Sequence, residues 1–129
     1  MAGLASDTPH PVDITLHQAS RLLCVAFDDG ARFELPCEYL RVYSPSAEVR
    51  GHGGGPMQTV AGKSRVNIVA IEPVGHYAVK LVFDDGHDSG LYGWDLLYSL
   101  GRDQAALWQD YLHRLAALGL ARDIEVSKS

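Results

Sequence analysis

The chain has 129 residues and a formal net charge of −5, with 47% hydrophobic and 21% charged residues. This length allows one hydrophobic core but not two ordinary domains, and the negative charge argues against nucleic acid as a partner. Residues 1–11 lack the pattern of a secretory signal and no apolar run approaches the length of a membrane span, so we expect a cytoplasmic protein without a membrane partner.

The first predicted unit is a strand pair followed by a helical turn. Alternating apolar residues predict two antiparallel strands over 13–18 and 21–27. The sequence Phe27-Asp28-Asp29-Gly30 then predicts a tight reversal, because glycine readily adopts the positive φ that such a turn requires. A returning strand is expected over 31–35, and Pro36 is expected to open a short helix over 37–42.

A long loop is predicted over 43–65, where glycine, serine and proline replace apolar periodicity. Long loops in compact domains are often functional or disordered. The segment Gly62-Lys63-Ser64 within this loop suggests phosphate binding, but the P-loop pattern fails because Met57 stands where its first glycine is required and a strand is expected to follow.

The second predicted unit repeats the first. Strands are expected over 66–74 and 77–83, with a hairpin across Gly75-His76, and a second Phe-Asp-Asp-Gly occupies 83–86, which is 56 residues after the first. A returning strand is expected over 87–92 and a helix over 93–100. Further matches at the same offset are Ala26 with Val82, Leu35 with Leu91 and Leu40 with Leu96.

A final helix is predicted from apolar residues at helical spacing, with Asp103 as the candidate N-cap and Gly119 as the stop. The predicted fold class is α+β, with an antiparallel sheet from two similar hairpin-plus-helix units and the C-terminal helix packed on it. We expect a single domain over 13–120, a disordered tail over 1–12 and a frayed tail over 121–129.

The sequence contains two groups of residues of types that can bind metals. Cys24 and Cys37 form no CxxC pattern, so we expect two small core residues and neither a disulfide nor a thiolate metal site. His87, His52 and Glu48 could bind iron or zinc weakly, because imidazole and carboxylate suit these metals, although their spacing is uneven. Alternatively, His87 simply starts the returning strand after Asp-Gly.

A family resemblance rests on Glu38-Tyr39-Leu40-Arg41, the segment from Ser44 to Val49, Phe83 to His87 and Trp94-Asp95-Leu96-Leu97. The chain resembles the gamma-butyrobetaine hydroxylase-like N-terminal domain family, in particular stand-alone bacterial members once described as a domain of unknown function. This resemblance implies an accessory domain, of a type found with iron and 2-oxoglutarate dependent oxygenases and with iron-sulfur carrier proteins. We expect no oxygenase catalytic domain, because too few residues follow Leu118 for its barrel.

The resemblance also implies a departure from the family's zinc site. In members fused to oxygenases, Cys-Pro-Cys-x-x-Cys and one histidine bind structural zinc. Here the matching residues are Ser44, Ser46 and Val49, which leaves only His87. Serine is a poor zinc ligand and valine is none, so the resemblance does not carry the zinc site over.

The function expected from the sequence is a non-catalytic interaction or ligand-binding module without a cofactor, whose partner is another protein or a small ligand. The predicted binding patch consists of Arg41, Ser44, Ser46, Glu48, His52 and His87. If the two units pack about a pseudo-twofold axis, the segment after the first helix lies beside His87. The alternatives are the weak iron or zinc site and a hydrolase or transferase that uses the glycine-rich loop, which lacks a base and nucleophile pair.

Overall fold

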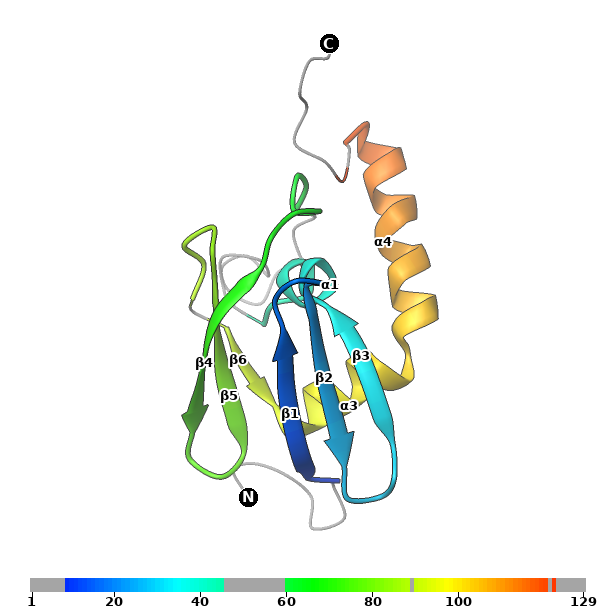
Figure 1. Cartoon of the computed structure of the whole chain (residues 1–129). Helices are drawn as coiled ribbons and strands as arrows, with labels where there is room; N and C mark the ends of the chain where they lie inside the picture. Colours follow the sequence, from blue (N-terminus) through cyan, green and yellow to red (C-terminus); the bar gives the residue numbers. More distant parts are fainter. Residues whose placement is uncertain (1–8, 46–59, 89, 121, 123–129) are drawn as a thin grey trace.

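The computed structural model describes residues 9–45, 60–88, 90–120 and 122. The first unit is an antiparallel sheet of β1 (Pro11–His17), β2 (Leu22–Phe27) and β3 (Arg32–Pro36) in that order, followed by α1 (Cys37–Val42) (Figure 1). The bounds of α1 are those predicted. Strand β1 begins at Pro11, two residues before the domain boundary that we expected at 13.

The second unit has the same order of elements. Its sheet consists of β4 (Ile68–Val74), β5 (Ala78–Phe83) and β6 (Leu91–Gly93), and α3 (Trp94–Arg102) and α4 (Gln104–Leu118) follow. The predicted α+β class is therefore confirmed, with the strands divided between two three-stranded sheets. Gly119 ends α4 with a φ of 69°, as the sequence predicted.

The two Asp-Asp-Gly turns are the same structure. Gly30 and Gly86 have φ values of 92° and 90°, and each donates its N–H to the carbonyl of the phenylalanine three residues earlier. The side chain of Asp29 accepts the N–H of Ala31 at 2.9 Å, and that of Asp85 accepts the N–H of His87 at 3.1 Å. The sequence repeat is therefore a repeat of backbone conformation and of hydrogen bonding.

The second unit differs from the first after its Asp-Asp-Gly turn. We expected a strand over 87–92, but β6 has three residues and pairs only with residues 78–80 of β5. The carbonyl of His87 still accepts the N–H of Phe83 at 2.9 Å, but residues 87 and 88 form no strand, and the His87 side chain is buried at 5% exposure. Asp103 is the N-cap residue of α4, as predicted, but its carboxylate binds Arg102 and makes no capping hydrogen bond.

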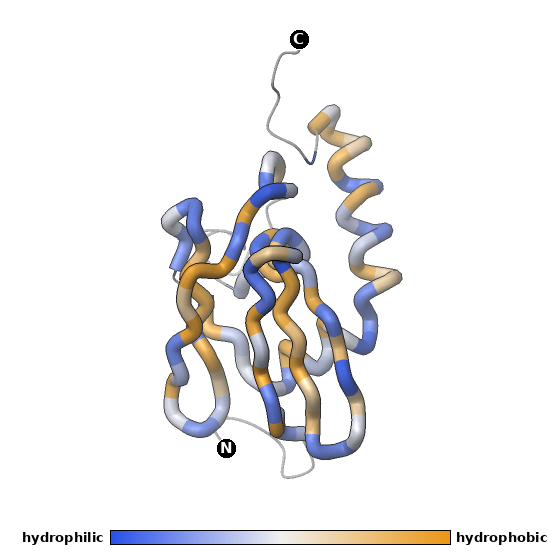
Figure 2. Tube along the Cα trace, viewed as in Figure 1, coloured by the Kyte–Doolittle hydropathy of each residue, from blue (hydrophilic) through white to orange (hydrophobic). Residues whose placement is uncertain are grey.

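Apolar side chains of both units form one core, and the two Asp-Asp-Gly turns lie in hydrophilic stretches of the trace (Figure 2). Cys37 belongs to this core as expected, whereas Cys24 is only partly buried. The largest fully buried side chains are Tyr39, Tyr92, Tyr111 and Phe83, together with Leu23, Leu35, Leu40, Ile68, Leu81, Leu97 and Val25.

Buried tyrosine hydroxyls join the helix of one unit to the other unit. Tyr39 of α1 donates to the carbonyl of Leu100 in α3 at 2.6 Å, and Tyr92 of β6 donates to the carbonyl of Leu40 in α1 at 2.6 Å. Burial raises the pKa of both phenols, so both hydroxyls remain donors. Each bond satisfies a carbonyl near a helix end, where no intrahelical partner is available.

Helix α4 runs beside α1 (Figure 1), and aromatic side chains connect it to α1 and to Val60. The hydroxyl of Tyr43 donates to the carbonyl of Leu107 at 2.8 Å, and that of Tyr111 donates to the carbonyl of Val60 at 2.6 Å. The rings of Tyr39 and Trp108 meet edge to face, 6.2 Å apart. Helix α4 thus covers the core on the side where α1 lies.

Replacing Tyr92 by Phe should lower the free energy of unfolding by about 1–2 kcal/mol, because the carbonyl of Leu40 loses its donor in a buried place. Urea denaturation measures this change. Tyr77→Phe is the matched control, since Tyr77 is 48% exposed and should change stability little. Equal effects of the two substitutions would show that the buried hydrogen bond does not stabilise the fold.

Candidate functional site

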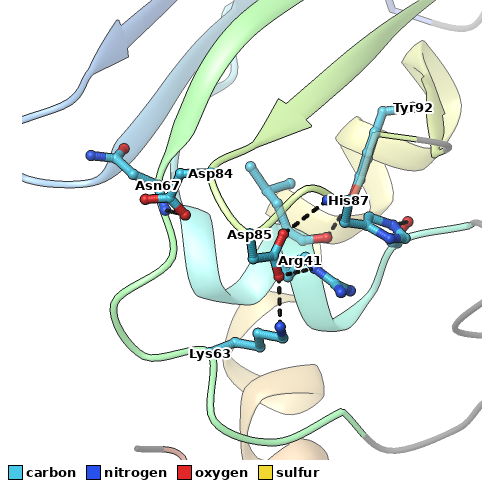
Figure 3. A network of polar contacts seen from close by, with 9 residues as sticks. Arg41, Lys63, Asn67, Asp84, Asp85, His87 and Tyr92 are labelled. Carbon is cyan, nitrogen blue, oxygen red and sulfur yellow. Dashed lines mark hydrogen bonds and ion pairs between the residues drawn. The ribbon is translucent and has the colours of Figure 1, made fainter. Parts of the chain in front are cut away.

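A cluster of polar side chains lies where the end of α1 meets the second Asp-Asp-Gly turn (Figure 3). At its centre, the hydroxyl oxygen of Ser44 and Nε2 of His87 are 2.9 Å apart. Ser44 is fully buried and His87 is 5% exposed. The two residues are 43 positions apart in sequence, and the packing of the first unit's helix against the second unit's turn brings them together.

Asp85 joins this turn to two cationic side chains. Its Oδ2 accepts hydrogen bonds from Nε of Arg41 at 2.9 Å and from Nζ of Lys63 at 2.6 Å. Burial of the carboxylate raises its pKa, but hydrogen bonds from Lys63, from the backbone N–H of His87 and from Arg41 outweigh burial and lower the pKa of Asp85 to about 2. Asp85 is therefore ionised at neutral pH.

One donor of this cluster has no acceptor among the residues that the structure describes. The Arg41 side chain is 11% exposed, and its Nη1 is buried without a hydrogen-bond partner in the structure as described. Buried polar atoms are nearly always paired, so an unpaired guanidinium nitrogen calls for an explanation. Arg41 and Lys63 together carry one more positive charge than the single carboxylate of Asp85 neutralises.

Gly90 permits the close approach of the two units at this point. A Cβ atom on Gly90 would collide with the Ser44 hydroxyl and lie 3.2 Å from Cδ of Pro45 and 3.3 Å from the ring of Tyr92. A side chain here would therefore push directly on the partner of His87. The sequence contains no local signal for this requirement, because it depends on a segment far away along the chain.

The structure brings together Arg41, Ser44 and His87 of the predicted patch, while Ser46, Glu48 and His52 lie outside the described residues. The expectation that Ser44 lies beside His87 is confirmed. Sequence reasoning did not include Asp85 and Lys63 in the patch. The repeat offered a signal for Asp85. In the second Asp-Asp-Gly turn, which should face the first unit's helix, Asp85 occupies the position that Asp29 has in the first turn.

The metal ligands considered from the sequence are only partly described. Of His87, His52 and Glu48, the structure describes His87 alone, and its Nε2 faces the Ser44 hydroxyl. The described part of the chain contains no group of three or more His, Cys, Asp or Glu residues placed to hold a metal ion. In the same residues, no helix is long and apolar enough to cross a membrane.

The fold and the cluster define a small α+β domain made of two equivalent units, with a buried polar junction between them. The chain belongs to the gamma-butyrobetaine hydroxylase-like, N-terminal family, whose sequence model matches residues 14–98. No curated protein matches the chain.

Similar solved structures support this assignment. Two NMR solution structures of proteins share 51% and 49% identity with the chain, at TM-scores of 0.80 and 0.81. The first alignment covers 100% of this chain and 99% of that one, and the second covers 94% and 95%. A crystal structure of a protein of unknown function from Acidithiobacillus ferrooxidans, described as a DUF971 family member, shares 39% identity at a TM-score of 0.61, covering 71% of this chain and 92% of that one.

Asp85 should make stability depend on acid pH. Its pKa of about 2 in the folded chain lies below the ordinary value of 3.8, so its contribution is present above about pH 4 and is lost as pH falls towards 2. Asp85→Asn should cost about 1–2 kcal/mol at pH 6, after allowance for solvent screening, and much less near pH 2, where about half of the Asp85 carboxylates are protonated. Urea denaturation at several pH values measures the difference, and Asp88→Asn controls for net charge. A constant difference between Asp85→Asn and wild type from pH 6 to 2 would contradict the assignment.

Gly90→Ala should separate Ser44 from His87. The added methyl group displaces the Ser44 side chain, at an expected cost of about 1–3 kcal/mol. The ring resonances of His87 in an NMR spectrum should shift, which distinguishes this local effect from general destabilisation. Gly30→Ala is the control, because a Cβ there meets nothing within 4 Å and only the positive φ is strained. Unchanged His87 resonances in Gly90→Ala would contradict the proposed contact.

Proposed function

We propose that this chain is a cytoplasmic, non-catalytic recognition module that binds another protein or a small ligand through the patch of Arg41, Ser44 and His87, together with Ser46, Glu48 and His52, which lie outside the described residues. The observation that carries the proposal is the buried Nη1 of Arg41, which lacks an acceptor in the structure as described. The patch is proposed to bind a group with acceptor oxygens, and a carboxylate is the simplest such group.

The charges around Arg41 support this ligand chemistry. Asp85 binds Nε of Arg41, which leaves the outer nitrogens of the guanidinium directed past the carboxylate on the side of His87 (Figure 3). Lys63 neutralises much of the Asp85 charge, so the charge of Arg41 is not fully cancelled. Because Nη1 is enclosed, a ligand reaches it only after a small shift of the surrounding side chains.

Burial argues for recognition and against catalysis by the Ser44–His87 pair. A serine oxygen 2.9 Å from a histidine nitrogen resembles a nucleophile and its base. A nucleophile must touch its substrate, however, and Ser44 is fully buried, so its role in the patch is to hold His87 and not to contact the ligand. The family description, an N-terminal part of hydroxylase-like proteins, also supports an accessory role. We propose no cofactor for the module.

The first test is an NMR titration of nitrogen-15 labelled, metal-free protein with sodium acetate, compared with sodium chloride at the same ionic strength. Acetate should shift the signals of Arg41, Lys63 and His87, and Arg41→Lys should remove most of this response, because lysine retains the charge but lacks Nη1. Arg102→Lys is the matched control, since Arg102 forms an exposed pair with Asp103. An acetate response that is absent, or that persists in Arg41→Lys, would overturn the proposed ligand chemistry.

Two further additions test the other candidate functions. Stoichiometric zinc or anaerobic ferrous iron that shifts or broadens the signal of His87, together with those of His52 and Glu48, would establish the metal-binding alternative in place of the metal-free module. Covalent labelling of Ser44 by a fluorophosphonate, detected by mass spectrometry, would contradict the non-catalytic assignment. We expect neither result.

A further inference from the structure

A pocket lies between the start of α1 and the first half of α4, separate from the patch around His87. Its volume is about 680 Å³. Apolar side chains form much of its wall, and one acidic side chain reaches into it. The lining residues are Pro36, Glu38, Tyr39, Gln104, Ala105, Trp108, Gln109 and Arg122.

Glu38 gives this pocket its chemistry. It lies in the first turn of α1 and is only 5% exposed, although glutamate is almost never buried without a partner. The partner is Arg122, whose Nη2 donates to Oε1 at 2.7 Å and whose Nε donates to Oε2 at 3.1 Å. Two parallel hydrogen bonds of this kind match the planar fork of a guanidinium group.

The indole of Trp108 completes the match to a guanidinium. The guanidinium carbon of Arg122 lies 5.3 Å from the centre of the Trp108 ring, within the range of cation–π attraction. The pocket therefore combines a bidentate carboxylate with an aromatic face. Arginine satisfies both at once, whereas the ammonium group of lysine offers neither the fork nor the flat surface.

The Glu38–Trp108 site and its partner Arg122 come from different parts of the chain. Glu38 and Trp108 belong to helices that pack against the core, so their side chains form a fixed site. Arg122 follows the last helix, and its side chain is 48% exposed despite the ion pair. Its carbonyl accepts the N–H of Ser64 at 3.2 Å. The guanidinium is thus partly exposed to solvent while it binds Glu38.

We propose that Glu38 and Trp108, on the wall of this pocket, form a guanidinium-binding site that the chain's own Arg122 occupies in the free protein. An arginine side chain of a partner protein enters through the pocket and takes the place of Arg122. The site lies at the opposite end of α1 from Arg41, and it is independent of the function proposed for the patch around His87. Arg122 is the internal competitor for the partner's arginine.

The test uses the full chain with Arg122→Ala and N-acetyl-arginine amide as the probe. The variant should unfold at a lower temperature than wild type, because Glu38 loses its partner, and the probe should raise that temperature. In a nitrogen-15 correlation spectrum, the probe should shift the Trp108 indole signal but not that of Trp94, which donates to the carbonyl of His76. Wild type should respond only at higher probe concentrations, because Arg122 competes.

The controls separate guanidinium recognition from simple charge pairing. N-acetyl-lysine amide should bind Arg122→Ala at least about tenfold more weakly than the arginine probe, as expected for the loss of one charge-assisted hydrogen bond. Adding Glu38→Gln to Arg122→Ala should abolish binding of the arginine probe. Arg102→Ala, which breaks an exposed ion pair, should leave the Trp108 region unchanged.

Three results would overturn the proposal: no response of a folded Arg122→Ala to the arginine probe, an equal response to the lysine probe, or equal affinity of wild type and Arg122→Ala. If Arg122→Ala does not fold, refolding by the arginine probe supports the proposal. The same titration is then made on Arg122→Lys, which retains a positive charge, and failure of the arginine probe to bind that variant overturns it.

Discussion

The hydrogen bond from the buried Tyr92 hydroxyl to the carbonyl of Leu40 fixes the end of α1, and the rest of the molecule is arranged around this short helix. A helix of six residues is not stable by itself in water, so α1 exists because of its surroundings. Five of its six residues are buried, which is unusual for a helix that carries charged side chains. The second unit supplies the tyrosine that completes it.

The reciprocity of the two units explains where polar side chains meet. In each Asp-Asp-Gly turn, the second aspartate reaches the helix of the other unit. Asp29 accepts the hydroxyl of Tyr98 in α3 at 2.6 Å, and Asp85 accepts Nε of Arg41 in α1 at 2.9 Å. The first contact is exposed and its donor is neutral. The second has two cationic donors and a buried serine–histidine pair beside it. Of the two equivalent positions, only that of Asp85 therefore lies next to a buried polar cluster.

Local sequence signals correctly predicted the secondary-structure elements that neighbouring residues determine. Pro36 and the apolar residues after it predicted α1, and Gly119 predicted the end of α4. The strand expected after His87 was wrong, because alternation of residue types does not reveal that a side chain turns inwards to meet Ser44. No local pattern distinguishes Tyr39 and Tyr92, which reach helix ends in the other unit, from ordinary core tyrosines.

The candidate sites show the same limit more sharply. The repeat implied that Ser44 lies near His87, because two similar units that pack about a pseudo-twofold axis place the segment after the first helix beside the second turn. Lys63 was considered only as part of a phosphate-binding loop, and its contact with Asp85 depends on the course of the chain between the units. The sequence places Arg122 in an expected frayed tail and names Glu38 only within the family resemblance, since an ion pair across 84 residues has no signature in sequence.

The charges on α1 serve its stability and its two candidate sites at the same time. Glu38 lies in the first turn and Arg41 in the last, which is the favourable placement of each charge in the dipole of a helix. Each charge also has a distant partner, Arg122 for Glu38 and Asp85 for Arg41, so both ends of the helix are anchored. A guanidinium ligand that displaces Arg122 from Glu38 can therefore replace this stabilising contact. The short helix can thus stay folded while Glu38 exchanges an internal partner for an external one and Arg41 keeps Asp85.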